Sequence, residues 1–158
     1  MAIDPGQFKF RTEVTVRNYE VDWQGIVHNA VYLLYFETGR IAYLQLCGVP
    51  INHETIRNES RIVVARNEID YRSPATFGQV LEVFTRVASI GDSSFVFEGL
   101  IIDKENRRIL VENRSVLVWL GLADGRPSSV PEGFRGAVAR IEGRNPVQES
   151  GGKRHTRG

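Results

Sequence analysis

An acid, a glycine and a histidine stand close together, just ahead of the most apolar segment of the chain. They are Asp22, Gly25 and His28, within the stretch NYEVDWQGIVHNAVYLLYFETGR at residues 18–40. A carboxylate can act as a nucleophile or as a general base, and glycine lets the backbone pass close to a ligand. A helix starting beside them would add free backbone N–H groups and the positive end of its dipole. The carboxylate could attack a carbonyl carbon, and the N–H groups could hold the oxyanion that develops.

Other kinds of reactive site are less well supported by the residues. The 3 histidines are too scattered for a usual zinc spacing, and the 1 cysteine adds little, so we expect no metal. No phosphate-binding glycine loop and no nucleophilic serine elbow is present. Cys47 has no cation that must lie beside it, and we expect a small core residue rather than a nucleophile. Asp22 itself could be a loop residue that makes only local turn bonds, and chemistry alone leaves that open.

The composition is that of an ordinary globular domain. The chain has 158 residues, 42% apolar and 25% charged, with a formal net charge of +1. This balance calls for neither nucleic acid nor an acidic membrane as partner. The apolar run near residues 30–46 is too interrupted by polar residues to span a membrane. With one cysteine and no secretory signal, we expect a cytoplasmic protein without a membrane or nucleic-acid partner.

The elements that must position these residues can be read from the apolar pattern. Residues 8–18 alternate and predict a strand, and residues 19–28 predict a loop. A helix that is apolar on nearly all sides follows, with Asn29 as its N-cap. Gly48 and Pro50 end it in the expected order.

After a short polar helix predicted at 52–58, the pattern changes to long strands. These are expected at residues 60–72, 79–90, 94–103 and 108–120. Short turns between consecutive strands make the sheet antiparallel. A curved sheet wrapped round the helix would cover its apolar sides, which predicts an α+β fold. We expect one domain over 1–140, with a turn and a short helix after residue 121, and a disordered basic tail over 141–158.

The opening stretch resembles the signature of hotdog-fold thioesterases of the 4-hydroxybenzoyl-CoA thioesterase type. The matching residues are Tyr19, Asp22, Gly25, Ile26, Val27, His28, Asn29, Tyr32, Phe36 and Glu37. The segments IDYRSPATFGQVLEV, IGDSSFVFEG and VLVWL also resemble later strands of that family, so the likeness covers roughly residues 8–135. The stretch is also similar to a plant and bacterial branch that acts on acyl-ACP or fatty acyl-CoA. This resemblance implies five antiparallel strands wrapped round one long helix.

The resemblance also implies a role for each matching residue. Asp22 stands where the family keeps its catalytic carboxylate, acting as a nucleophile or as a base on water. The backbone N–H of Asn29 would polarise the thioester carbonyl, and Gly25 would let the thioester approach. His28 would orient water or the carbonyl, or would be only a helix-entry residue.

Further residues are expected to bind the acyl group and the coenzyme A portion of the substrate. Tyr19 and Tyr32 would line the acyl pocket or belong to the core. Glu37 is a second carboxylate at the pocket, expected to be a buried structural acid paired with the neighbouring subunit. Coenzyme A carries phosphates, for which polar residues at strand ends are candidates unless they are simply solvated. These candidates are Arg72, Ser73, Ser93, Ser94 and Arg126.

The expected activity is hydrolysis of an acyl-CoA thioester to a carboxylic acid and free CoA, without a further cofactor. Three alternatives stay open: an acyl-ACP thioesterase, a hotdog enoyl-CoA hydratase or dehydratase that uses Asp22 and His28, and a non-catalytic acyl-binding subunit. An exposed sheet edge favours pairing with another copy, and relatives build active sites at such interfaces. We therefore expect a homodimer that assembles into a tetramer.

Overall fold

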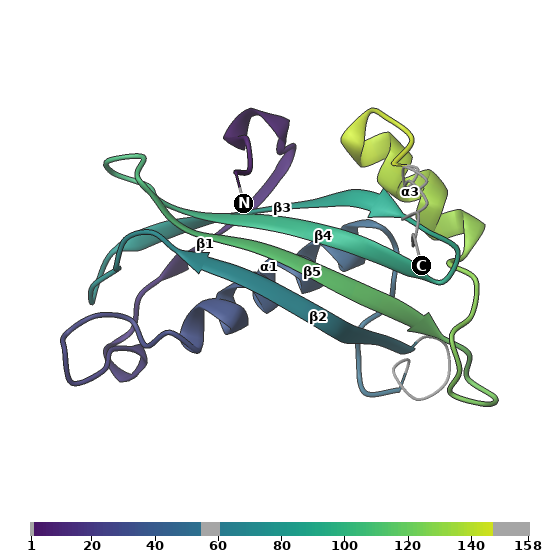
Figure 1. Ribbon diagram of the computed structural model, residues 1–158, viewed down its shortest axis with the longest axis horizontal. Coiled ribbons are helices and arrows are strands. Elements are labelled where there is room, and N and C mark those ends of the chain that lie inside the picture. Colours follow the sequence, from purple (N-terminus) through teal and green to yellow (C-terminus); the bar gives the residue numbers. More distant parts are fainter. Residues whose placement is uncertain (1, 55–60, 147–158) are drawn as a thin grey trace, which may run out of the picture.

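The computed structural model describes residues 2–54 and 61–146, in which a curved antiparallel sheet covers one long helix (Figure 1). The strands are β1 (Phe10–Thr15), β2 (Arg61–Tyr71), β3 (Val80–Ile90), β4 (Ser94–Asp103) and β5 (Ile109–Leu120); the helices are α1 (Val31–Leu46) and α3 (Glu132–Glu142); and two short 3₁₀ turns are η1 (Pro5–Gln7) and η2 (Asn18–Glu20). The strand order is β1-β3-β4-β5-β2. This confirms the predicted α+β hotdog architecture.

Alternation along the strands explains which side of the sheet meets the helix. In β4, Phe97 packs edge-to-face on Tyr43 of α1, with ring centroids 5.4 Å apart. Leu100 and Ile102 belong instead to a separate apolar cluster with Ile3 from the N-terminal segment. Because side chains alternate between faces, a shift of one residue in strand pairing would turn the core side outward. The apolar pattern therefore determines the register.

The helix can lie close to the sheet only because glycine occurs at two contact points. A Cβ atom on Gly39 of α1 would lie 2.5 Å from Thr85 Oγ1 and 3.0 Å from Val83 Cγ1 of β3. A Cβ atom on Gly99 of β4 would lie 2.7 Å from the ring of Phe36 of α1. These two contacts fix the distance between α1 and the concave face.

The start of α1 differs from the prediction by its cap. The helix begins at Val31 with Ala30 as N-cap, and no side chain of the N-cap residue makes a capping bond. His28 Nδ1 instead accepts the Ala30 N–H at 3.0 Å, and the His28 carbonyl accepts the Val31 N–H at 2.9 Å. The prediction that Asn29 caps the helix is therefore wrong, because the imidazole ring of the preceding residue satisfies this end.

Two tyrosines tie the start of α1 to the end of β2 and the loop that follows. The hydroxyl of Tyr32 accepts the buried backbone N–H of Ala75 at 3.1 Å. The hydroxyl of Tyr71 donates to the Asn29 carbonyl at 2.9 Å. The Val27 N–H also donates to the Ala75 carbonyl, at 2.9 Å. These bonds hold the loop before α1 against the loop after β2.

Residue 140, the predicted end of the domain, falls inside α3. Glu142, at the end of this helix, is buried and accepts a 2.5 Å hydrogen bond from the Tyr43 hydroxyl. The carbonyl of Pro146 accepts the Ile90 N–H at 2.7 Å. Most of the helix predicted at 52–58 and the tail from residue 147 lie outside the described residues.

We predict that Gly39→Ala destabilises the protein, because the added methyl has to displace Thr85 or Val83. Overpacking of this kind costs about 1–3 kcal/mol of unfolding free energy, with each kcal/mol lowering Tm by about 2–4 °C. Thermal and urea unfolding measure the change. Gly133→Ala in α3 is the control, since a Cβ atom added there would meet nothing within 4 Å; equal losses in both variants would contradict the close-contact account.

A second pair of variants tests the link between α1 and the loop after β2. Tyr32→Phe leaves the buried Ala75 N–H without an acceptor, which should cost about 1–3 kcal/mol of unfolding free energy. Tyr71→Phe removes a bond at an exposed position, and about 0.5 kcal/mol or less is expected. Urea unfolding of both variants gives the comparison, and a larger loss for Tyr71→Phe would show that the Ala75 bond is not the main tie.

Candidate active site

A cavity of about 350 Å³ lies where the loop before α1, the start of α1 and the end of β2 meet. Its lining residues are Asp22, Gln24, Ile26, Val27, Asn29, Tyr32, Tyr71, Arg72, Ser73 and Pro74. Five residues predicted for the site from the sequence are among them: Asp22, Asn29, Tyr32, Arg72 and Ser73. The fold thus brings together residues from two distant parts of the chain.

Asp22 lies half-buried at this cavity, on a tight turn. Its Oδ1 atom accepts the Gln24 N–H at 2.8 Å, and its carbonyl accepts the Gly25 N–H at 3.0 Å. Gly25 adopts a left-handed backbone, with φ of 79°, which glycine takes without strain. The local turn bonds expected of a loop Asp are therefore present. They engage Oδ1, while among the described residues Oδ2 has no hydrogen-bond partner.

A backbone N–H just ahead of α1 belongs to Asn29, which also lines this cavity. Ala30 and Val31 donate to His28, as described above, whereas no acceptor for the Asn29 N–H is found in the described chain. Such a donor, beside the positive end of a helix dipole, favours a developing negative charge. The cavity is therefore lined by a residue with an unengaged carboxylate oxygen and by one with an unengaged amide donor, as far as the described chain shows.

One wall of the cavity is aromatic. Tyr32 and Tyr71 pack edge-to-face with ring centroids 5.8 Å apart. Burial raises the pKa of Tyr32 above its usual value, so this hydroxyl stays protonated at neutral pH. Tyr71 was missed in the sequence reasoning. It stands two residues after the inward-facing Ile69, and alternation along a strand places such residues on the same face. This pattern could have predicted that Tyr71 faces the site.

The cavity rim holds a cation that already has a carboxylate partner. Arg72 approaches Glu112 of β5 through Nε at 2.9 Å and Nη2 at 2.5 Å. This contact raises the pKa of Arg72. About half of the Arg72 side chain remains exposed, and Ser73 stands next to it. The rim can therefore offer positive charge and a hydroxyl to an anionic ligand.

Three of the assigned residues that precede α1 lie outside this cavity. Tyr19 is 77% exposed, and its hydroxyl accepts a hydrogen bond from Arg17 Nη1 at 2.8 Å. It therefore lies on the surface, and not in the pocket or the core as predicted. His28 is exposed and acts in capping α1, as its helix-entry alternative foresaw. Gly25 shapes the Asp22 turn without lining the cavity.

The remaining candidates lie elsewhere on the chain. Tyr71 pairs with Val111 at one end of the sheet, whereas Ser94 pairs with Val118 near the other end. Ser93 and Arg126 flank that second end. The five candidate coenzyme A residues therefore do not converge in one chain. Glu37 is exposed rather than buried, and it borders a different cavity.

Other predicted features concern chemistry that the cavity does not use. Cys47 is half-buried against the core, and burial raises the pKa of its thiol to about 12, as fits a core residue. Among residues 2–54 and 61–146, no group of three or more His, Cys, Asp or Glu side chains could hold a metal ion. None of the helices in these ranges is long and apolar enough to cross a membrane.

Comparison with known proteins agrees with the geometry. Residues 16–138 match the model of the thioesterase-like superfamily. An acyl-acyl carrier protein thioesterase of Arabidopsis thaliana, ATL2, is 32% identical over 78% of this chain, which spans only 64% of that relative. The Escherichia coli acyl-CoA thioester hydrolase YbgC is 27% identical over 78% of this chain and 90% of its own length.

A solved structure gives a likeness in three dimensions as well. A Thermus thermophilus thioesterase complexed with coenzyme A and Zn is 36% identical, with a TM-score of 0.76. The match covers 87% of this chain and 97% of that one. Together with the family match over residues 16–138, this shows that the chain belongs to the thioesterase-like superfamily of hotdog proteins.

Proposed function

We propose that this protein hydrolyses an acyl-CoA thioester at the cavity that Asp22 and Asn29 share. The observation that carries the proposal is that Asp22 and Asn29 line one cavity, while the Asp22 Oδ2 atom and the Asn29 N–H both lack a hydrogen-bond partner in the described chain. Three relatives named as thioesterases or thioester hydrolases support the same chemistry.

In the proposed reaction the thioester carbonyl oxygen accepts the Asn29 N–H, which stabilises the oxyanion that forms. As a base, Asp22 takes a proton from water while the water oxygen bonds to the carbonyl carbon. The carbon–sulfur bond then breaks, and the thiolate takes up a proton. As a nucleophile, Asp22 would form an acyl anhydride that water cleaves to the same acid and thiol. The resting geometry fits both routes.

The position of His28 favours hydrolysis over hydration of an enoyl thioester. A hydratase of the kind considered would need Asp22 and His28 to act on one substrate. His28 does not border the cavity, and its Nδ1 is engaged by the Ala30 N–H. The Oδ2 atom of Asp22, which has no partner within residues 2–54 and 61–146, speaks against the alternative of a non-catalytic binding subunit.

The scattered coenzyme A candidates fit together if two copies pair through β2. In the described chain β2 pairs only with β5, and Val63 and Val64 are 44% and 46% exposed on it. Two-fold antiparallel pairing of this edge would set the Arg61 end of one strand beside the Tyr71 end of the other. Ser94 and Arg126 of one copy would then approach Arg72 and Ser73 of the second. A tetramer stays a prediction.

The central experiment replaces Asp22 by Asn and follows thiol release from acyl-CoA. Asn keeps an acceptor for the Gln24 N–H, so the turn should survive, while the base or nucleophile is lost. We expect turnover to fall by about 10²–10⁴-fold, with an unchanged Tm and with a dimer mass by light scattering.

Asp124→Asn is the matched control, because Asp124 Oδ1 accepts the Arg126 N–H at 3.0 Å in the same kind of turn. Its turnover should stay close to that of the unaltered protein. An Asp22→Asn variant that releases thiol at a near-normal rate would exclude Asp22 from the chemistry. Acyl-CoA binding without thiol release by the unaltered protein would instead support the non-catalytic alternative.

A further inference from the structure

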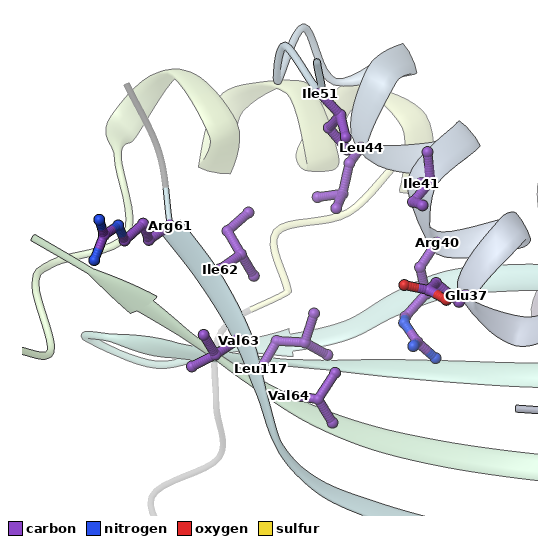
Figure 2. A pocket seen from close by; sticks show the side chains of 10 residues that line it. All are labelled: Glu37, Arg40, Ile41, Leu44, Ile51, Arg61, Ile62, Val63, Val64 and Leu117. Atoms are coloured by element: carbon purple, nitrogen blue, oxygen red, sulfur yellow. The ribbon is translucent and has the colours of Figure 1, made fainter. Parts of the chain in front are cut away.

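A second and more apolar cavity lies along the same helix. It measures about 550 Å³ and lies between the C-terminal half of α1 and the N-terminal half of β2 (Figure 2). Its lining residues are Glu37, Arg40, Ile41, Leu44, Ile51, Arg61, Ile62, Val63, Val64 and Leu117. All but three of these side chains are aliphatic, so the space suits a hydrocarbon chain.

Arg40 is one of the three exceptions in this lining. Its residue is only 8% exposed, and its Nη1 atom is buried without a hydrogen-bond partner among the described residues. Glu37 lies one helical turn away, but no ion pair joins the two in the described chain. Figure 2 shows the guanidinium extending from α1 towards the strands, on the side of Leu117 and Val64. A buried cation with an unused donor is costly unless something supplies an acceptor.

Both cavities are bordered by residues of α1 and β2, at opposite ends of these elements. The first is bordered by Tyr32 and Tyr71, and the second by α1 residues from Glu37 onward and by β2 residues 61–64. Tyr32 and Arg40 are eight residues apart on the helix, a rise of roughly 12 Å at about 1.5 Å per residue. An acyl chain of medium length that extends along α1 from the thioester would therefore reach Arg40.

We propose that this apolar cavity takes the acyl chain of the substrate, and that Arg40 selects chains bearing an oxygen atom near their far end. The recognised group is a hydrogen-bond acceptor, either a hydroxyl or a carboxylate oxygen. The aliphatic residues bind the methylene chain, and the Arg40 guanidinium donates to the oxygen. This inference rests on the proposed thioesterase activity and adds a specificity-determining residue to it.

The test compares three ten-carbon thioesters of coenzyme A: decanoyl-CoA, 10-hydroxydecanoyl-CoA and 9-carboxynonanoyl-CoA. For the unaltered protein we expect kcat/KM at least about tenfold higher for one or both oxygenated chains than for decanoyl-CoA, since hydrogen bonds to charged groups are strong. In Arg40→Met, which keeps much of the apolar stem, that ratio should fall to about one. Arg40→Lys should retain part of the preference for oxygenated chains. The two oxygenated substrates distinguish a neutral from an anionic acceptor.

Arg61→Met is the matched control, because Arg61 borders the same cavity but points away from Arg40 in Figure 2. Its substrate ratio should equal that of the unaltered protein. Thermal unfolding of Arg40→Met should occur no earlier than in the unaltered protein, since an unpaired buried charge has been removed.

Two results would overturn the inference. Thiol release from all three substrates at equal kcat/KM would show that Arg40 does not select for an oxygen atom on the acyl chain. The thioesterase proposal would remain intact. An Arg40→Met variant that turns from dimer to monomer, with the substrate ratio unchanged, would assign the cavity to a second copy of the chain. Absence of thiol release from any acyl-CoA would instead refute the proposed function itself.

Discussion

The close contact between α1 and the concave side of the sheet is the constraint on which the other features depend. Gly39 and Gly99 have no side chain that would hold the layers apart. Thr85 and Phe36 lie where a Cβ atom on these glycines would be in contact with them. With the helix at this distance, its start meets the end of β2, where Tyr71 contacts Tyr32 and bonds the Asn29 carbonyl. The loop that carries Asp22 is thereby positioned beside Tyr71.

In the proposed reaction, this arrangement would place the catalytic residues at the start of α1 and the acyl-chain cavity along its second half. The start of α1 presents unsatisfied backbone donors, as every helix does, and here His28 takes up those of Ala30 and Val31 while the Asn29 N–H remains available within the described chain. Further along, the same helix turns its aliphatic side and Arg40 to β2. Leu34 is 58% exposed, and β2 is an edge strand of the described sheet, through which we propose that a second copy pairs.

The sequence was informative where a local pattern determines the structure. Alternation predicted strands at 60–72 and 94–103, and the structure has them at 61–71 and 94–103. The helix cap was missed because Asn29 and His28 are adjacent and both can accept an amide hydrogen bond, so that only the observed backbone geometry decides. The coenzyme A candidates were chosen as polar residues in turns, and turn chemistry does not say at which end of a sheet a turn lies. Tyr71 and Arg40 were passed over because their importance comes from long-range packing.

The central claim is that the thioester binds between residue 22 and the Asn29 N–H. A crystal structure of Asp22→Asn with uncleaved decanoyl-CoA tests it most directly. The account predicts the thioester carbonyl oxygen within hydrogen-bond distance of the Asn29 nitrogen, with the carbonyl carbon beside the side chain of residue 22. A thioester bound elsewhere on the sheet, with the Asn29 N–H unengaged, would contradict it.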